Sequence, residues 1–100
     1  MPTSTQVVVY EIAADKVDEF LGIKDELITE TEAIPGLVTS ATFRSDDNPN
    51  LFIDRMEWES TEAATAGNEQ FMALPLAGRF MSLMAGPPTL AGGFTRIAGA

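Results

Sequence analysis

The chain has 100 residues, of which 45% are hydrophobic and 21% are charged, and these fractions are typical of a single soluble globular domain. Fifteen acidic and six basic side chains give a formal net charge of −9, so we expect no binding to nucleic acid or to anionic membranes, which both require basic surface. The absence of His and Cys excludes the ordinary zinc sites and removes the commonest general base at neutral pH.

The N-terminal part of the chain predicts a strand and a long helix. Residues 6–12, QVVVYEI, are β-branched and aromatic, which is typical of a well-covered strand. Residues 1–16 contain no basic region before this short apolar run and no cleavage-site pattern, so we expect no signal peptide and a cytoplasmic protein. Asp15 is expected to cap a helix over residues 17–34, where apolar residues recur with helical spacing. Pro35 and Gly36 then end it in a turn.

Residues 46–57, DDNPNLFIDRME, have two interpretations. Four residues of this stretch have the spacing of calcium ligands in an EF-hand loop: Asp46, Asn48, Asn50 and Glu57. The sixth position of such a loop is normally Gly but here is Leu51, and the flanking segments 37–44 and 51–59 have the composition of strands instead of helices. We therefore predict a hairpin turn and no metal site.

The C-terminal half predicts two helices and a strand. Ser60 or Thr61 is expected to cap an Ala-rich helix that reaches about Leu74. Pro75 begins a shorter helix, and residues 90–97 form the last strand. The whole order predicts an α+β fold, a ferredoxin-like β-α-β-β-α-β sandwich in which helices cover one face of an antiparallel sheet.

Both faces of this sheet are expected to need cover. Strands 6–12 and 51–59 carry apolar residues on both faces, and the helices can cover only one of them. A single domain spanning residues 1–100 also has a thin core of its own. We therefore expect the chain to pair with a second copy as a homodimer.

Two segments, IPGLVTSATFR and NLFIDRMEWESTEAA, carry a family resemblance. They resemble the antibiotic biosynthesis monooxygenase family, whose members form dimeric α+β barrels, and the resemblance spans nearly the whole chain. It implies a cofactor-independent monooxygenase that acts on a small aromatic, phenolic or quinol substrate. In that chemistry a base removes a proton from the substrate, and the resulting carbanion reduces molecular oxygen without a cofactor.

Two charged side chains are candidates for the site. Asp54 alternates with Phe52, Met56 and Trp58, so it either points into the interior or lies on an exposed edge. Lys24 falls in the middle of the apolar arc of its helix, where its amine either reaches solvent along an apolar stem or enters a cavity and pairs with Asp54. In the family's cofactor-free oxygenases an Asn four residues before a strand-end Trp lines the cavity. That likeness implies Asp54 as base or hydrogen-bond partner, Trp58 as packing wall and indole donor, and Lys24 as stabiliser of the substrate anion.

Further side chains are expected to line a substrate pocket, with an ordinary Met-rich core as the alternative: Tyr10, Met56, Gly67, Phe71, Arg79 and Phe80. Gly67 is predicted to face inward and to leave room where many members of the family carry His. The missing His favours an alternative function, a non-catalytic homodimer that binds a small ligand or serves a structural role.

Overall fold

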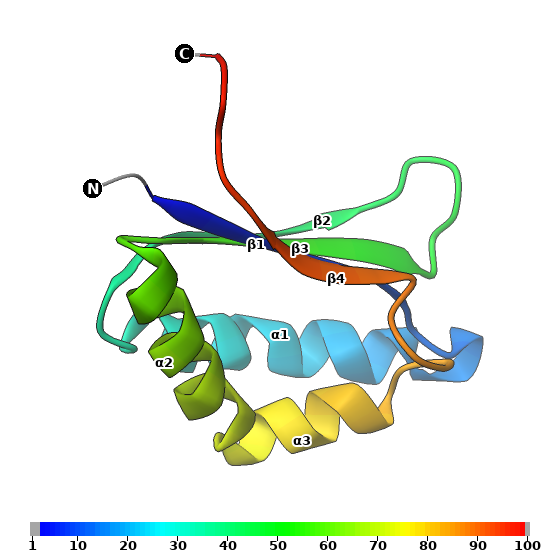
Figure 1. The fold of residues 1–100 in the computed structure, drawn as a ribbon. Coiled ribbons are helices and arrows are strands. Elements are labelled where there is room, and N and C mark those ends of the chain that lie inside the picture. The colour runs from blue at the N-terminus through cyan, green and yellow to red at the C-terminus, as the bar shows by residue number, and fades with distance from the viewer. Residues whose placement is uncertain (1–2, 100) are drawn as a thin grey trace.

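The structure consists of two layers, an antiparallel sheet and a group of helices that lie on one side of it (Figure 1). It is a computed structural model that describes residues 3–99 of the domain predicted over residues 1–100. In chain order the elements are β1 (Ser4–Glu11), the short 3-10 helix η1 (Ala14–Lys16), α1 (Val17–Glu32), β2 (Leu37–Arg44), β3 (Leu51–Trp58), α2 (Thr61–Met72), α3 (Pro75–Ser82) and β4 (Leu90–Phe94). The strand order is β2-β3-β1-β4, and neighbouring strands are antiparallel. The predicted ferredoxin-like α+β fold is confirmed.

The strand β1 lies in the middle of the sheet, since β3 pairs with one of its edges and β4 with the other. This position explains why its sequence is rich in β-branched residues without a breaker. In the register, Val8 lies opposite Asp54 and Tyr10 lies opposite Phe52. Alternate side chains of a strand share a face, so these four residues point toward the helices.

The start of α1 contradicts the prediction that Asp15 caps it. Asp15 lies inside η1, and no side chain caps the helix. Backbone groups hold this turn instead: the Lys16 N–H donates to the Ala13 carbonyl at 2.8 Å, and the Ala13 N–H donates to the Leu83 carbonyl at 3.0 Å. The second contact joins distant parts of the chain, so local sequence does not reveal it. After α1, Gly36 has a φ of 88°, a value that favours glycine, as the predicted turn requires.

One hydrogen bond determines the start of α2, and the pairing with β1 determines the end of β4. The Ser60 side chain caps α2, because its oxygen accepts a hydrogen bond from the Ala63 N–H at 3.0 Å. β4 ends at Phe94, earlier than the predicted residue 97, because Phe94 pairs with Thr5 and β1, which begins at Ser4, has only one residue left beyond that pair. Residues 95–99 continue away from the sheet on the side opposite the helices (Figure 1).

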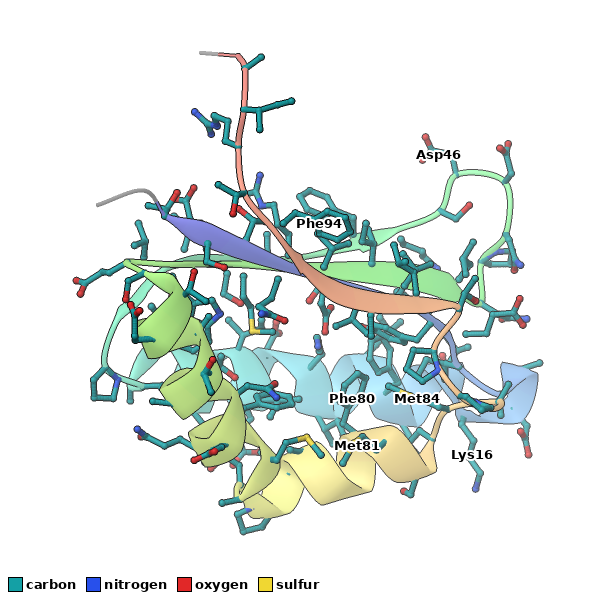
Figure 2. All side chains as sticks on the ribbon, viewed as in Figure 1. Lys16, Asp46, Phe80, Met81, Met84 and Phe94 are labelled. Carbon is teal, nitrogen blue, oxygen red and sulfur yellow. The ribbon has the colours of Figure 1, made fainter. Side chains whose placement is uncertain are left out.

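The turn between β2 and β3 is a hairpin turn, as predicted. Ser45 Oγ accepts hydrogen bonds from the backbone N–H groups of Asp47 and Asn48, and Asn48 Oδ1 accepts from the Asn50 N–H. Asp46 lies at the tip of the hairpin (Figure 2), whereas Glu57 lies in β3 and pairs with the neighbouring strands. These positions cannot surround one ion, and residues 3–99 contain no cluster of three or more acidic side chains placed to hold a metal.

The core lies between the sheet and the helices and has two parts. The first part includes four aromatic rings in contact with one another and contains Tyr10, Ile12, Val17, Phe20, Ile23, Leu27, Phe52, Ala77, Phe80 and Leu83. The second part lies toward the other end of β3 and contains Ile34, Met56, Trp58 and Ala64. Figure 2 shows Phe80 between α3 and the sheet. No helix within residues 3–99 is both long and apolar enough to span a bilayer.

The opposite side of the sheet has no helix over it (Figure 1). One row of paired residues on this side is apolar across all four strands: Phe43, Ile53, Val9 and Leu90. Phe43 and Leu90, at the two ends of the row, are each about half-exposed, and so is Phe94, which lies on the same side (Figure 2). We call the surface formed by these five residues the open face. The chain itself covers only the helix side of a sheet that is apolar on both sides.

Candidate functional site

A buried carboxylate, Asp54, lies on the helix side of β3 and is held by three donors. Its Oδ1 accepts hydrogen bonds from the Tyr10 hydroxyl and the Thr42 hydroxyl, each at 2.8 Å. Its Oδ2 accepts from Lys24 Nζ, also at 2.8 Å. Asp54 and Lys24 are each only 8% exposed. The interior interpretation of both residues is confirmed, and the alternatives of an exposed edge for Asp54 and a solvent-exposed amine for Lys24 are wrong.

Three aromatic rings lie near the Lys24 amine. Its Nζ lies 4.3 Å from the ring centroid of Phe80, 5.7 Å from that of Phe20 and 5.8 Å from that of Tyr10. Ring faces attract cations by about 0.5–2 kcal/mol each, and most strongly where water is excluded. Lys24 therefore has two kinds of partner, the Asp54 carboxylate and the nearby aromatic rings. Together they offset part of the free-energy cost of burying the charge of Lys24.

The Tyr10 hydroxyl is kept as a hydrogen-bond donor. Burial raises the pKa of Tyr10 well above its ordinary value of 10.0, and the charge of Asp54 and the hydrogen bond to Asp54 raise this pKa further. A phenolate beside the carboxylate would be a second buried negative charge, so the protonated form is strongly preferred. Asp54 Oδ1 thus keeps two hydroxyl donors across the neutral pH range.

This shift can be measured directly, since Tyr10 is the single tyrosine of the chain. We expect no phenolate absorbance near 295 nm in the folded protein at about pH 11, whereas the urea-unfolded protein titrates near pH 10. The folded pKa is raised, so its contribution to stability is complete below about pH 10 and is lost as the pH rises above that value. Tyr10→Phe should remove this alkaline loss of stability. A folded protein that titrates near pH 10 would show that Tyr10 is not held by Asp54.

Trp58 lies four residues beyond Asp54 on the same face of β3, in the second part of the core. It is 1% exposed, and its indole nitrogen Nε1 has no hydrogen-bond partner within residues 3–99. The indole N–H can only donate, and leaving such a group buried and unpaired costs about 1–3 kcal/mol. An oxygen acceptor placed beside Trp58 would recover that energy.

Gly67 does not leave room for a ligand, and that prediction is wrong. A Cβ at residue 67 would overlap the ring carbons Cη2 and Cζ3 of Trp58. The indole therefore occupies the space that the missing side chain provides on α2. The inward direction of Gly67 was predicted correctly from helical spacing, but its occupant comes from a distant strand.

Four of the other predicted pocket residues lie in or against the helix-side core: Tyr10, Met56, Phe71 and Phe80. The prediction for Arg79 is wrong, because Arg79 is exposed on α3 and its Nη2 lies 3.3 Å from Glu19 Oε2 at the surface. Thr42 was missed by the sequence analysis although a signal exists. Thr42 and Asp54 are equally distant from Asn48 at the middle of the hairpin, and equidistant residues face each other across antiparallel strands.

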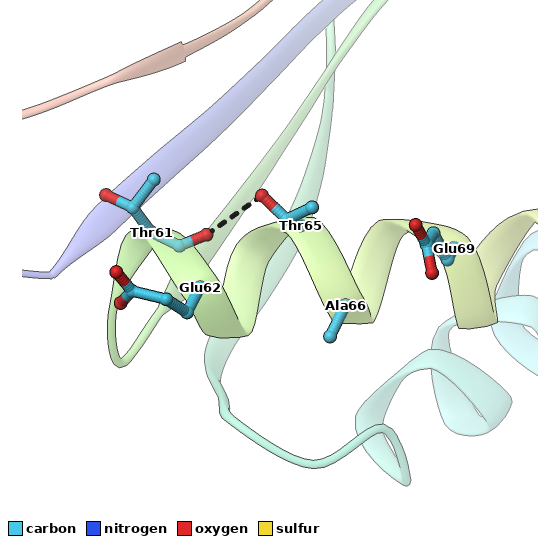
Figure 3. A pocket seen from close by; sticks show the side chains of 5 residues that line it. All are labelled: Thr61, Glu62, Thr65, Ala66 and Glu69. Atoms are coloured by element: carbon cyan, nitrogen blue, oxygen red, sulfur yellow. Dashed lines mark hydrogen bonds between the residues drawn. The ribbon is translucent and has the colours of Figure 1, made fainter.

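Two surface hollows formed by the described residues lie away from this cluster. One of about 470 Å³ lies on the outer face of α2, where Thr61, Glu62, Thr65, Ala66 and Glu69 line it (Figure 3). There the Thr65 hydroxyl donates to the Thr61 carbonyl at 3.1 Å, which is a bond within the helix. A second hollow of about 140 Å³ lies on the open face. Asp54, Lys24 and Tyr10 line neither hollow, so in this structure their side chains pack against one another.

Solved structures show where this fold occurs. A mutant of SnoaB, a cofactor-independent oxygenase from Streptomyces nogalater, is 20% identical and has a TM-score of 0.83, with 99% of this chain and 97% of that chain covered. A protein from Nitrosomonas europaea provisionally named an antibiotic biosynthesis monooxygenase is 16% identical with a TM-score of 0.77, covering 95% and 90%. A conserved protein from Methanosarcina mazei is 16% identical with a TM-score of 0.76, covering 94% and 92%. Neither the family models nor the curated proteins gave a match to the sequence. The fold implied by the sequence resemblance is confirmed.

Proposed function

We propose that the protein is a cofactor-independent monooxygenase that acts on a small aromatic substrate of the phenol or quinol class. The observation that carries this proposal is the pair of polar features on one face of β3, the buried Asp54–Lys24 pair and the unpaired indole N–H of Trp58. A carboxylate that accepts a proton and donors that hold the resulting anion are the groups such a reaction needs. The likeness of the fold to SnoaB, a cofactor-independent oxygenase, supports the same chemistry.

In the proposed mechanism Asp54 accepts a proton from the substrate, and the substrate anion gives electrons to molecular oxygen. Lys24, beside Asp54, and the Trp58 N–H, at the other end of the site, stabilise negative charge on different oxygen atoms of the substrate anion. In the keto tautomer of such a substrate, a ring CH2 group and O2 together give a carbonyl and water, so one oxygen atom enters the substrate and the substrate supplies all four electrons. Because Lys24 occupies Asp54 Oδ2 in this structure, the substrate must displace or share that contact.

The spacing along β3 limits the substrate. Asp54 and Trp58 are four residues apart, which corresponds to about 13 Å along a strand. With a hydrogen bond to each of the two residues, an aromatic system of two or three fused rings spans about this length. Met56 lies between the two residues, and its flexible thioether is suited to pack against a flat ring.

Oxygen uptake tests this function. The purified protein should consume oxygen with 1,4-dihydroxynaphthalene or 1,8,9-trihydroxyanthracene faster than the autoxidation measured without protein. Asp54→Asn should lower kcat by about 10²- to 10⁴-fold, the usual contribution of a general base. Asp46→Ala, at the tip of the hairpin, is the matched control and should leave the rate unchanged. Uptake that never exceeds the autoxidation rate across such a panel would contradict the proposed function.

We also propose that the protein is a cytoplasmic homodimer in which the open faces of two copies meet. The half-exposed apolar side chains of the open face support this arrangement, because monomeric proteins rarely expose large apolar patches. Light scattering at micromolar concentration should give twice the chain mass of 10.7 kDa. A well-folded monomer would rule the dimer out.

A second candidate function is a non-catalytic homodimer of the same fold that binds a small ligand or serves a structural role. The observation that favours it is the closed state of the site: three donors already surround Asp54, and the Trp58 ring fills the space beside Gly67. Binding of the same polycyclic phenols without oxygen uptake, measured by quenching of Trp58 fluorescence, would favour this candidate over the enzyme.

A further inference from the structure

The two carboxylate oxygens of Asp54 differ in the number of hydrogen bonds that they already accept. Oδ1 accepts two, from the hydroxyls of Tyr10 and Thr42, each at 2.8 Å. Oδ2 accepts one, from Lys24 Nζ at 2.8 Å. A carboxylate has about four lone-pair positions that accept hydrogen bonds, two on each oxygen. Within residues 3–99, Oδ1 is therefore fully occupied, and the free position lies on Oδ2 beside the lysine amine.

Thr42 and Tyr10 reach Oδ1 from the two strands that flank β3. Thr42 in β2 lies directly opposite Asp54 in the register, and threonine is stiff at χ1, so strand pairing sets the position of its hydroxyl. Tyr10 in β1 is fully buried. Its ring packs against three phenylalanine rings, with centroids 5.9, 6.0 and 5.0 Å away: Phe20, Phe52 and Phe80. Both hydroxyls are thus held in place before a substrate arrives.

The two hydroxyls control which oxygen of Asp54 can take a proton. The last torsion of an Asp side chain is broad and roughly two-fold, so a free carboxylate can exchange its two oxygens by rotation. Two hydrogen bonds to Oδ1 and one from Lys24 to Oδ2 oppose that rotation. Donors that only stabilised a buried charge could lie on either oxygen, whereas here both hydroxyls share Oδ1. This uneven distribution keeps Oδ2 able to accept a proton.

We propose that Thr42 is a positioning residue of the monooxygenase: together with Tyr10 it occupies Oδ1 of Asp54 and so directs the substrate proton to Oδ2. In this step a C–H or O–H bond of the substrate breaks, an O–H bond forms at Oδ2, and the electron pair stays on the substrate. The proton neutralises Asp54, so the charge of Lys24 then acts on the substrate anion beside it. This role rests on the proposed function, to which it adds a residue and a direction of proton transfer.

Oxygen uptake with 1,8,9-trihydroxyanthracene by Thr42 variants tests this role. Thr42→Val keeps the branched shape of threonine but lacks the hydroxyl, so it frees one position on Oδ1. It should lower kcat by about 10- to 100-fold, because a slightly misplaced catalytic group costs up to about 10²-fold in rate. KM should stay within about two-fold, because the Thr42 hydroxyl binds Asp54 and not the substrate. Thr42→Ser restores the donor and should keep kcat within about three-fold of the wild type.

Two further variants complete the experiment. Thr65→Val is the matched control and should leave kcat and KM unchanged, because Thr65 is exposed on α2 and its hydroxyl donates to Thr61 within the same helix. Thr42→Ala lacks the same hydroxyl with a smaller side chain, so it should show the same loss of kcat even if Thr42→Val fails to fold. Circular dichroism checks the fold of each variant.

The outcomes separate the role of Thr42 from the proposed function. An active wild type with unchanged kcat in folded Thr42→Val or Thr42→Ala would overturn the role of Thr42 and leave the function standing. A loss carried by KM alone would do the same, as would a Thr42→Ser protein that loses as much activity as the variants without a hydroxyl. If the wild type itself consumes no more oxygen than autoxidation with any phenol or quinol of the panel, the function and the role of Thr42 are both overturned.

Discussion

Replacing Lys24 with Met is expected to lower the free energy of unfolding by about 3–5 kcal/mol, because the Asp54 carboxylate then stays buried without its cation. The methionine side chain is nearly as long and apolar enough to pack against Phe80, so lost packing contributes little. Urea unfolding followed by the fluorescence of Trp58, the single tryptophan, measures the change. A loss below about 1 kcal/mol would mean that the pair contributes no more than a surface ion pair.

A double-mutant cycle separates the charge interaction from packing. Asp54→Asn keeps an Oδ1 acceptor for the Tyr10 and Thr42 hydroxyls but leaves the Lys24 charge unpaired. Lys24→Met combined with Asp54→Asn removes both charges, so the double variant should be more stable than the sum of the single losses predicts, by about 2 kcal/mol or more. Losses that add to within about 0.5 kcal/mol would show that the two charges are not coupled.

The surface of the same molecule provides the matched control. Arg79 and Glu19 form an ion pair at 3.3 Å between side chains that are about half-exposed. Solvent screens such a pair, so Arg79→Met should change the free energy of unfolding by less than about 1 kcal/mol. At positions 24 and 79 alike, methionine replaces a long cationic side chain that is paired with a carboxylate. The difference between the two losses of stability therefore measures the effect of burying the ion pair.

These variants also bear on the proposed function. Apolar residues of similar volume are often as stable as a buried ion pair, or more stable. A stable Lys24→Met/Asp54→Asn protein that has lost oxygen uptake would therefore separate the role of the pair in catalysis from its role in folding. A double variant that keeps full activity would leave Asp54 and Lys24 as structural residues only.

The Asp54–Lys24 pair was within reach of sequence analysis because two simple periods determine it. The alternation of a strand places Asp54 with Phe52 and Met56, and 100° per residue places Lys24 in the middle of an apolar helix arc. The layer between sheet and helices in a small domain is thin, so two oppositely charged side chains that both point into it are expected to lie close together. The structure adds Thr42, which only the register of the hairpin reveals.

Other features could not be read from the sequence because distant contacts determine them. The start of α1 depends on a hydrogen bond from Ala13 to Leu83, so the local signal at Asp15 was misleading. Arg79 lies on a helix of only eight residues, which is too short for apolar spacing to define an inner face. Gly67 was correctly placed inward, but a missing side chain does not show which neighbour fills the space.

Gly67→Ala is expected to lower the free energy of unfolding by about 2–3 kcal/mol, although alanine favours helices over glycine by about 1 kcal/mol. The added Cβ would overlap Trp58 ring carbons, and the buried indole has neighbours on every side, so the ring and α2 must move apart. Gly22→Ala in α1 is the matched control, because a Cβ added there meets no neighbouring atom within 4 Å. That change should instead stabilise the protein by about 0.5–1 kcal/mol.

The opposite signs at positions 67 and 22 follow from packing alone, since both glycines lie inside helices and receive the same methyl group. Trp58→Phe removes the ring carbons that the new methyl group would meet, so Gly67→Ala in that background should cost much less than in the wild type, by about 1–2 kcal/mol. Urea unfolding followed by circular dichroism measures the wild type and the four variants without relying on the tryptophan. If Gly67→Ala instead stabilises the protein as Gly22→Ala does, the indole of Trp58 can move to accommodate the added methyl group. The space beside Gly67 would then be open to a ligand.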